Sequence, residues 1–184
     1  IDALNDICFV MECAYFNYQD IFGFDTPKEK LRVMVAKNEE EYRKIFYDLV
    51  GTNPPPGARG YFVPALWPNN KSKQNHLLCF YDMSTQMPST STLLHECTHY
   101  VMELVKQKYN CSRPPIWLAE EWATYYEASK LDGERLVTNV INQIRLPCIK
   151  DTINNQSYIK LKDFINLSLN EYAFTAPLID MQKH

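Results

Sequence analysis

Apolar and polar residues follow two different periods along the chain, and the period predicts which element each segment forms. Residues 1–22 carry apolar side chains at intervals of three and four, the spacing of one face of an amphipathic helix. Residues 31–35 have the length and β-branched content of a strand. Residues 39–49 return to helical spacing, with Asn38 as a capping residue before them and Gly51 after their end.

The strands are expected early in the chain and most of the helices later. Residues 60–63 and 76–81 have the composition of two more strands. A helix follows the capping residues 88–92 and extends to about residue 109, where a turn with Pro114 and Pro115 separates it from a helix at residues 116–130. Further helices are predicted at residues 134–144 and 161–169. Strands followed by helices indicate an α+β fold.

Length and charge restrict the class of protein. A chain of 184 residues is most simply one domain, residues 1–184. It has no initiator methionine, so we expect a mature form or a fragment of a longer chain. A net charge of −3 gives no electrostatic reason to bind nucleic acid or an anionic membrane. The sequence has no apolar run long enough for a transmembrane segment.

Cysteines and glycosylation sequons leave the compartment open. The six cysteines are compatible with disulfides in an exported protein, but no C-x-x-C pair indicates a zinc knuckle or a redox site. Asn-x-Ser sequons begin at residues 70, 110, 155 and 166, and they matter only in a eukaryotic secretory pathway. Export is therefore one of several alternatives, and the oligomeric state is equally open.

The strongest chemical signal is an H-E-x-x-H pattern inside the apolar segment at residues 93–100. His95 and His99 lie four residues apart, so a helix places both imidazoles on one face, where they can reach a single ion. Glu96 is rotated by about 100° from His95 and points toward the open side of such an ion. Two nitrogen ligands beside a carboxylate that takes a proton from metal-bound water are typical of zinc hydrolases.

A catalytic zinc ion usually has a third protein ligand, and the following helix offers two candidates. Glu120 and Glu121 both qualify by spacing, because a short turn lets the two helices pack face to face. Glu103, one turn beyond His99, is a weaker alternative. Glu127 shares the helix face of Glu120, where it either orients a ligand histidine or lies on the surface.

Two segments carry a resemblance to a known group of enzymes. H-E-C-T-H at residues 95–99 and W-L-A-E-E-W-A at residues 117–123 resemble the gluzincin metallopeptidases, which include the aminopeptidase N and, more distantly, the thermolysin-like families. Residues 92–99 and 115–127 are closer still to a family of largely uncharacterised bacterial proteins assigned as peptidases. That family has T-L-L-H-E-x-x-H and P-x-W-L-x-E-G-x-A-x-Y-x-E segments. Glu121 departs from it, since the family usually has glycine there.

The resemblance implies a fold, an activity and a set of site residues. It implies a zincin-like domain with a small mixed sheet, an active-site helix and a ligand-bearing helix, in which the strand at residues 76–81 pairs with extended substrate. It also implies that His95, His99 and Glu120 hold Zn²⁺, that Glu96 is the general base, and that the substrate is a peptide or protein. Gluzincins stabilise the oxyanion with a downstream Tyr or His, for which Tyr172 is the candidate.

Two other interpretations remain. The metal site could belong to a non-catalytic binding or structural module in which zinc ties two helices together. A purely structural site has no need of Glu96, which argues against this interpretation. A metal hydrolase with a non-peptide substrate is the second alternative, and the residues alone do not separate it from a peptidase.

Overall fold

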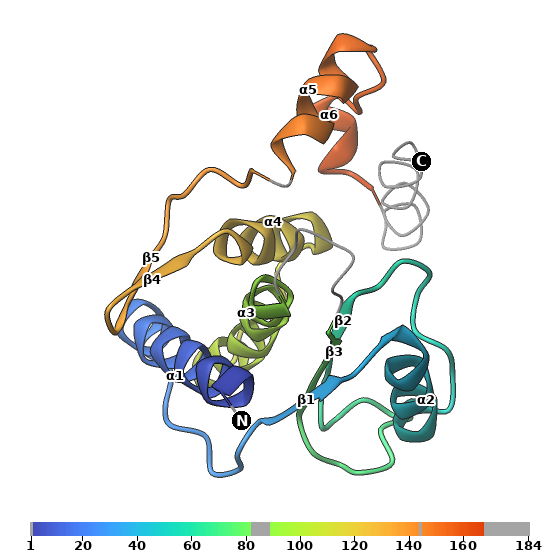
Figure 1. Ribbon diagram of the computed structural model, residues 1–184. Helices are drawn as coiled ribbons and strands as arrows, with labels where there is room; N and C mark the ends of the chain where they lie inside the picture. Colours follow the sequence, from blue (N-terminus) through green and yellow to red (C-terminus); the bar gives the residue numbers. More distant parts are fainter. Residues whose placement is uncertain (1, 82–88, 144, 168–184) are drawn as a thin grey trace.

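The computed structural model describes residues 2–81, 89–143 and 145–167, and it confirms the α+β fold (Figure 1). A three-stranded mixed sheet occupies the N-terminal half and packed helices follow it. The helices are α1 (Asp2–Phe22), α2 (Glu39–Val50), α3 (Ser89–Tyr109), α4 (Ile116–Glu127), α5 (Leu146–Asn154) and α6 (Leu161–Phe164). The strands are β1 (Arg32–Ala36), β2 (Gly60–Val63), β3 (His76–Phe80), β4 (Lys130–Asp132) and β5 (Arg135–Val137).

The strand order of the sheet overturns one prediction about the substrate. The order is β1-β3-β2, with β1 parallel and β2 antiparallel to β3. Both edges of β3 are therefore paired within the sheet, and the expectation that residues 76–81 pair with substrate is wrong. The sheet edge nearer the H-E-x-x-H helix belongs to β2, whose Phe62 backbone N–H points to Glu96 on α3 and away from β3.

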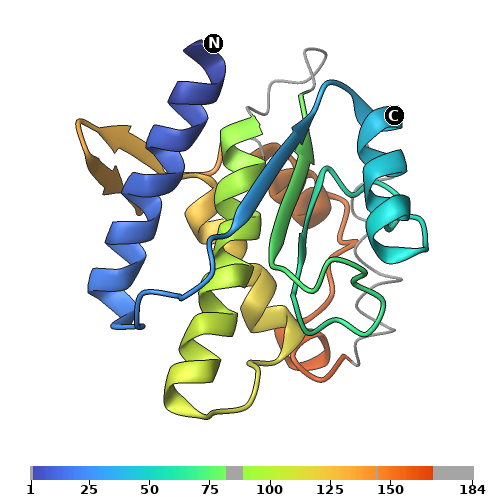
Figure 2. The ribbon, with the colours of Figure 1, turned by 90° about the horizontal axis from the view of Figure 1, so that it is seen from below.

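A hydrophobic cluster covers each face of the sheet. Leu77 and Cys79 on β3 pack toward α1 and α3, whereas Leu78 packs toward α2 with Tyr42 and Phe46. This alternation follows from the two-residue period of a strand. Figure 2 shows α3 lying between α1 and the sheet, so α3 is covered on two sides by other elements.

Local capping explains where α2 begins and ends. The Asn38 side chain accepts a hydrogen bond from the backbone N–H of Glu41 at 2.9 Å. Gly51 ends the helix with φ of 82°, a left-handed conformation that glycine adopts without steric cost, and its N–H donates to the carbonyl of Tyr47. Both signals were predicted from the sequence.

The segment after α4 differs from the prediction. Residues 134–144 were expected to form a helix, but this range contains strand β5, which pairs with β4 in an antiparallel hairpin. Its turn contains Asp132 followed by Gly133 at φ of 61°, a typical hairpin signal. Leu136 is buried in the cluster that includes α1, and this burial stabilises the hairpin against α1. The helix predicted to extend to residue 130 therefore ends at Glu127.

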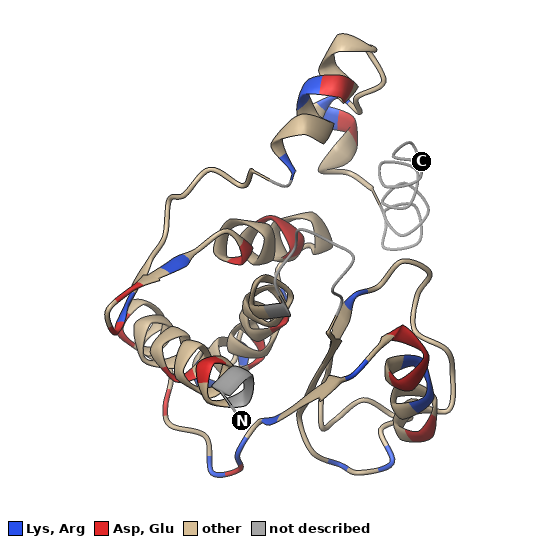
Figure 3. Cartoon of the chain, viewed as in Figure 1, with Lys and Arg blue, Asp and Glu red and all other residues tan. Residues whose placement is uncertain are grey.

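The C-terminal helices also differ from the prediction. Helix α5 was not expected, and α6 covers only the first part of the helix predicted at residues 161–169. Neither helix has a buried residue. Acidic and basic residues are mixed along the chain, as α2 and α5 show in Figure 3.

The structure also bears on the cysteines, on one of the sequons and on the question of a transmembrane helix. All six cysteines are free thiols. Asn70, the first residue of one sequon, is fully buried, and its side-chain amide donates to the backbone carbonyls of Pro64 and Gln74. Within the described residues, no helix combines the length and the hydropathy that crossing a bilayer requires.

Candidate metal centre

Helix α3 holds the two histidines of the motif on one face. The ring centroids of His95 and His99 are 5.1 Å apart. Two of the residues between them, Cys97 and Thr98, pack into the interior, and the Thr98 hydroxyl donates to the Leu94 carbonyl and bonds to Tyr18 of α1. These buried contacts fix the rotation of α3 and so determine which way its histidines point.

Helix α4 adds a carboxylate to this pair. One oxygen of Glu120, Oε2, lies 3.3 Å from Nε2 of His95, and the other, Oε1, lies 3.5 Å from Nε2 of His99. One ligand atom from each of the three residues lies within 4.8 Å of the others. The side chains of His95, His99 and Glu120 are 14%, 20% and 28% exposed, so solvent reaches the group.

The ligand types and the spacing of these three residues are compatible with a divalent metal ion such as zinc. Metal–ligand distances of about 2.0–2.1 Å in a tetrahedral site place neighbouring ligand atoms about 3.4 Å apart. The distances from Glu120 to the two histidines, each measured from a different carboxylate oxygen, lie close to that value. Two imidazoles and one carboxylate also form a known ligand set of catalytic zinc, one that leaves a coordination position open. The group is therefore a possible metal site.

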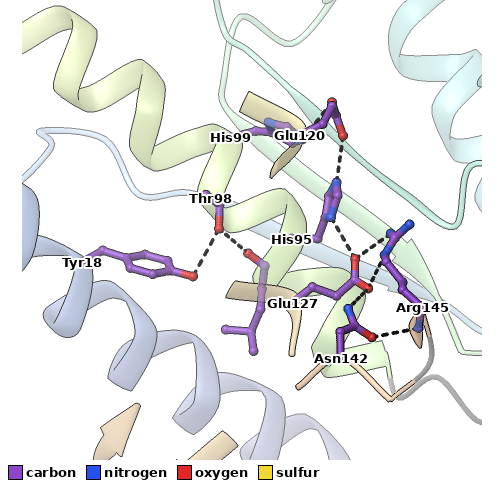
Figure 4. A network of polar contacts seen from close by, with 9 residues as sticks. Tyr18, His95, Thr98, His99, Glu120, Glu127, Asn142 and Arg145 are labelled. Carbon is purple, nitrogen blue, oxygen red and sulfur yellow. Dashed lines mark hydrogen bonds and ion pairs between the residues drawn. The ribbon is translucent and has the colours of Figure 1, made fainter. Parts of the chain in front are cut away.

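A buried carboxylate behind His95 selects the nitrogen that faces the site. Oε2 of Glu127 lies 3.0 Å from Nδ1 of His95, and Glu127 is fully buried at the end of α4 (Figure 4). A hydrogen on Nδ1 leaves Nε2, the nitrogen nearer Glu120, with a lone pair for a metal. Glu127 in turn accepts hydrogen bonds from Asn142 and Arg145.

The sequence did not reveal Asn142 and Arg145. They lie in the segment between β5 and α5, Asn142 within the helix predicted at residues 134–144 and Arg145 just after it, and no local motif marks them. Their approach to Glu127 depends on the β4–β5 hairpin, which reverses the chain after α4. The one signal in the sequence for this arrangement was the Asp132-Gly133 pair, because a hairpin turn brings the following segment back toward α4.

The interactions of His95 and Glu127 shift the pKa values of these two groups in opposite directions. Burial alone lowers the pKa of His95, but hydrogen bonds to Glu120 and Glu127 outweigh it and raise this pKa to about 10. Burial likewise raises the pKa of Glu127, but its bonds to His95 and Arg145 dominate and lower it to about 2. The two carboxylates thus favour the protonated form of His95 in the absence of metal, and a metal ion at Nε2 competes with a proton there.

Glu96 is not one of the three candidate ligands, and its carboxylate contacts strand β2. The backbone N–H of Phe62 donates to Oε2 of Glu96 at 2.8 Å. No described residue donates to its other oxygen, Oε1. Burial raises the pKa of the Glu96 carboxyl above its ordinary value, against the opposing influence of His95 and His99. A Cβ on Gly60 would lie 3.1 Å from Cγ of Glu96 and 2.5 Å from Cγ2 of Thr92, so only glycine allows this close approach.

The remaining candidates lie elsewhere or outside the described residues. Glu103 accepts hydrogen bonds from Lys106 and Arg113 and is not part of the candidate metal site. Glu121 is exposed on α4. Tyr172, the oxyanion candidate, falls outside the residues that the structure describes.

The interactions of Glu103 give a testable pH dependence of stability. Burial raises its pKa, but the bonds from Lys106 and Arg113 prevail and lower it below the ordinary value. A lowered pKa contributes stability above the unfolded pKa of about 4.3, and this stability is lost as the pH falls through the folded pKa. We expect Glu103→Gln to lower the free energy of unfolding by about 1 kcal/mol at pH 7, because both partners are partly exposed.

Urea denaturation of both metal-free proteins at pH 7 and pH 3 measures this difference. The gap between Glu103→Gln and the parent should narrow at the lower pH. A gap that is equal or wider at pH 3 would contradict the assignment of Glu103 as a stabilising ion pair.

Comparisons of the chain with protein-family models, with curated proteins and with solved structures gave no match.

Proposed function

We propose that this protein is a zinc-dependent peptidase, with His95, His99 and Glu120 as the metal ligands and Glu96 as the general base. The observation that carries the proposal is Glu96: it is a buried carboxylate with a raised pKa, beside the three candidate ligands but not among them. A zinc ion that only held α3 and α4 together would need no such group. When bound, zinc would supply the Lewis acidity that activates water and polarises a carbonyl group.

Glu96 is suited to proton transfer. The Phe62 N–H holds one carboxylate oxygen, which fixes the side chain and leaves Oε1 available to a water molecule. A pKa raised toward neutrality makes a carboxylate a better base at neutral pH. Glu96 would take a proton from the attacking water and pass it to the leaving amine.

The open edge of β2 supports a peptide as the substrate. Alternate residues of an antiparallel strand direct their backbone groups to the partner strand, and the Phe62 N–H points away from β3. Gly60 and Phe62 therefore direct backbone groups away from β3, and of these the Phe62 N–H is already taken by Glu96. An extended peptide would add to this edge through the remaining backbone groups, as in other cases of strand addition. This role replaces the one predicted for residues 76–81.

The experiment that tests the proposal is metal-dependent cleavage of a mixed peptide library, read by mass spectrometry. We expect products with zinc-loaded protein, none after a chelator removes the metal, and their return when zinc is restored. Binding of one zinc ion per chain without any product would contradict the peptidase and favour a non-catalytic zinc module. Cleavage that survives the chelator would contradict the role of the metal.

A further inference from the structure

We propose that Arg145 is a positioning residue for the metal site, which fixes the Glu127 carboxylate and through it the imidazole of His95. The inference rests on the proposed zinc site and adds a residue to it from outside α3 and α4. Arg145 directly precedes α5. It therefore also links the C-terminal helices to the metal site.

Arg145 holds Glu127 with two parallel hydrogen bonds. Its Nε donates to Oε1 at 2.9 Å and its Nη2 donates to Oε2 at 2.8 Å. A guanidinium group that binds both oxygens of a carboxylate fixes the plane of that carboxylate, which a single donor cannot do. Oε2 is also the oxygen that lies 3.0 Å from Nδ1 of His95, so the fixed plane determines the direction of that contact.

Asn142 stabilises the contact between Arg145 and Glu127. Its side-chain amide donates to Oε1 of Glu127 at 3.0 Å, and its side-chain oxygen accepts from the backbone N–H of Arg145 at 3.2 Å. Figure 4 shows Asn142 and Arg145 beside the Glu127 carboxylate, which in turn lies next to His95. Asn142 thus contacts both the carboxylate of Glu127 and the backbone of Arg145.

The expected consequence is a stronger and better-directed metal ligand. A histidine binds metal best when the partner of its other nitrogen fixes the ring and the tautomer, and losing such a partner typically costs about 10- to 100-fold in metal affinity. Arg145 acts one residue further out, so we expect an effect near the lower limit, about tenfold.

The charge of Arg145 and its two hydrogen bonds to Glu127 have opposite effects on metal affinity. Its positive charge repels a bound cation, so removing the charge strengthens metal binding, whereas losing the two-pronged contact weakens it. The Arg145 side chain is 41% exposed, and solvent therefore screens the repulsion. Arg145→Lys separates the two effects, because lysine keeps the charge but cannot bind both oxygens in the same geometry.

The test compares the parent chain with Arg145→Lys, Arg145→Gln and the control Arg135→Lys, an exposed arginine on β5. Zinc affinity is measured by competition with a chromophoric chelator, and the visible spectrum of the cobalt-substituted protein reports the geometry around the metal. We expect Arg145→Lys to bind zinc about tenfold more weakly, with an altered cobalt spectrum. Arg145→Gln should lie between Arg145→Lys and the parent, since it also removes the repulsion. Arg135→Lys should match the parent.

The outcomes distinguish this inference from the proposed function. If the parent binds zinc and Arg145→Lys has the same affinity and cobalt spectrum, the inference fails and the zinc site stands. A lower melting temperature of metal-free Arg145→Lys without a change in affinity would show a purely structural role and also overturn it. Failure of the parent to bind zinc would overturn both proposals. If the Arg145 variants do not fold, Asn142→Ala must weaken zinc binding several-fold, and unchanged binding there refutes the inference.

Discussion

Replacement of Glu96 by glutamine is expected to lower the rate of peptide hydrolysis by about 100- to 10,000-fold, the usual contribution of a general base. Glutamine keeps the size of the side chain, and its carbonyl oxygen can still accept the hydrogen bond from the Phe62 N–H. It cannot take a proton from water. The loss should therefore appear in kcat, while the bound zinc and the melting temperature stay close to those of the parent.

Glu103→Gln is the matched control, because it makes the same change two turns further along α3. Its partners are Lys106 and Arg113, and it makes no contact with the candidate ligands. We expect full activity from this variant under conditions where it remains folded. Retained turnover in Glu96→Gln would contradict the mechanism, and so would an equal loss in Glu103→Gln.

The central part of the site could be predicted because its information is local. His95 and His99 are one helical turn apart, so the helix alone brings them together. Glu120 and Glu127 are seven residues apart, two turns of the same helix, and so face the same side. A short turn then suffices to place α4 against α3, where the two helices make close contact. Each step requires only the period of a helix and the position of a turn.

The supporting contacts could not be predicted, since they depend on pairing between distant segments. The donor to Glu96 is the backbone N–H of Phe62, and backbone groups leave no trace in a residue pattern. The order of β2 and β3 in the sheet decides which strand has a free edge, and the composition of the two strands is too similar to show it. Arg145 reaches Glu127 only because the hairpin after α4 turns the chain back.

Spacing alone does not choose between Glu120 and Glu121, and the structure shows the physical reason for the choice. Adjacent residues on a helix differ in direction by about 100°, so only one of the two can face α3. The structure directs Glu120 to both histidines and leaves Glu121 exposed. The family likeness had favoured the same residue despite the glycine expected at position 121.

A pair of variants tests this choice, and its expected effect on metal binding is large. Glu120→Gln should weaken zinc binding by at least about 100-fold, since even the loss of a group that only orients a ligand costs about 10- to 100-fold. Glu121→Gln removes the same charge from the next residue, where solvent screens it, and should change the affinity less than about twofold. Competition with a chelator measures both, and metal analysis after dialysis gives the number of ions retained.

Both variants replace a glutamate of α4 by glutamine and remove the same charge. A difference between their zinc affinities therefore reports the direction of the side chain. Equal losses would mean that the negative charge of α4 attracts the ion without direct ligation. A loss in Glu121→Gln alone would require a rotation of α4 by about 100° about its axis. That rotation would also carry Glu127 away from Nδ1 of His95, so the same result would overturn the role of Arg145.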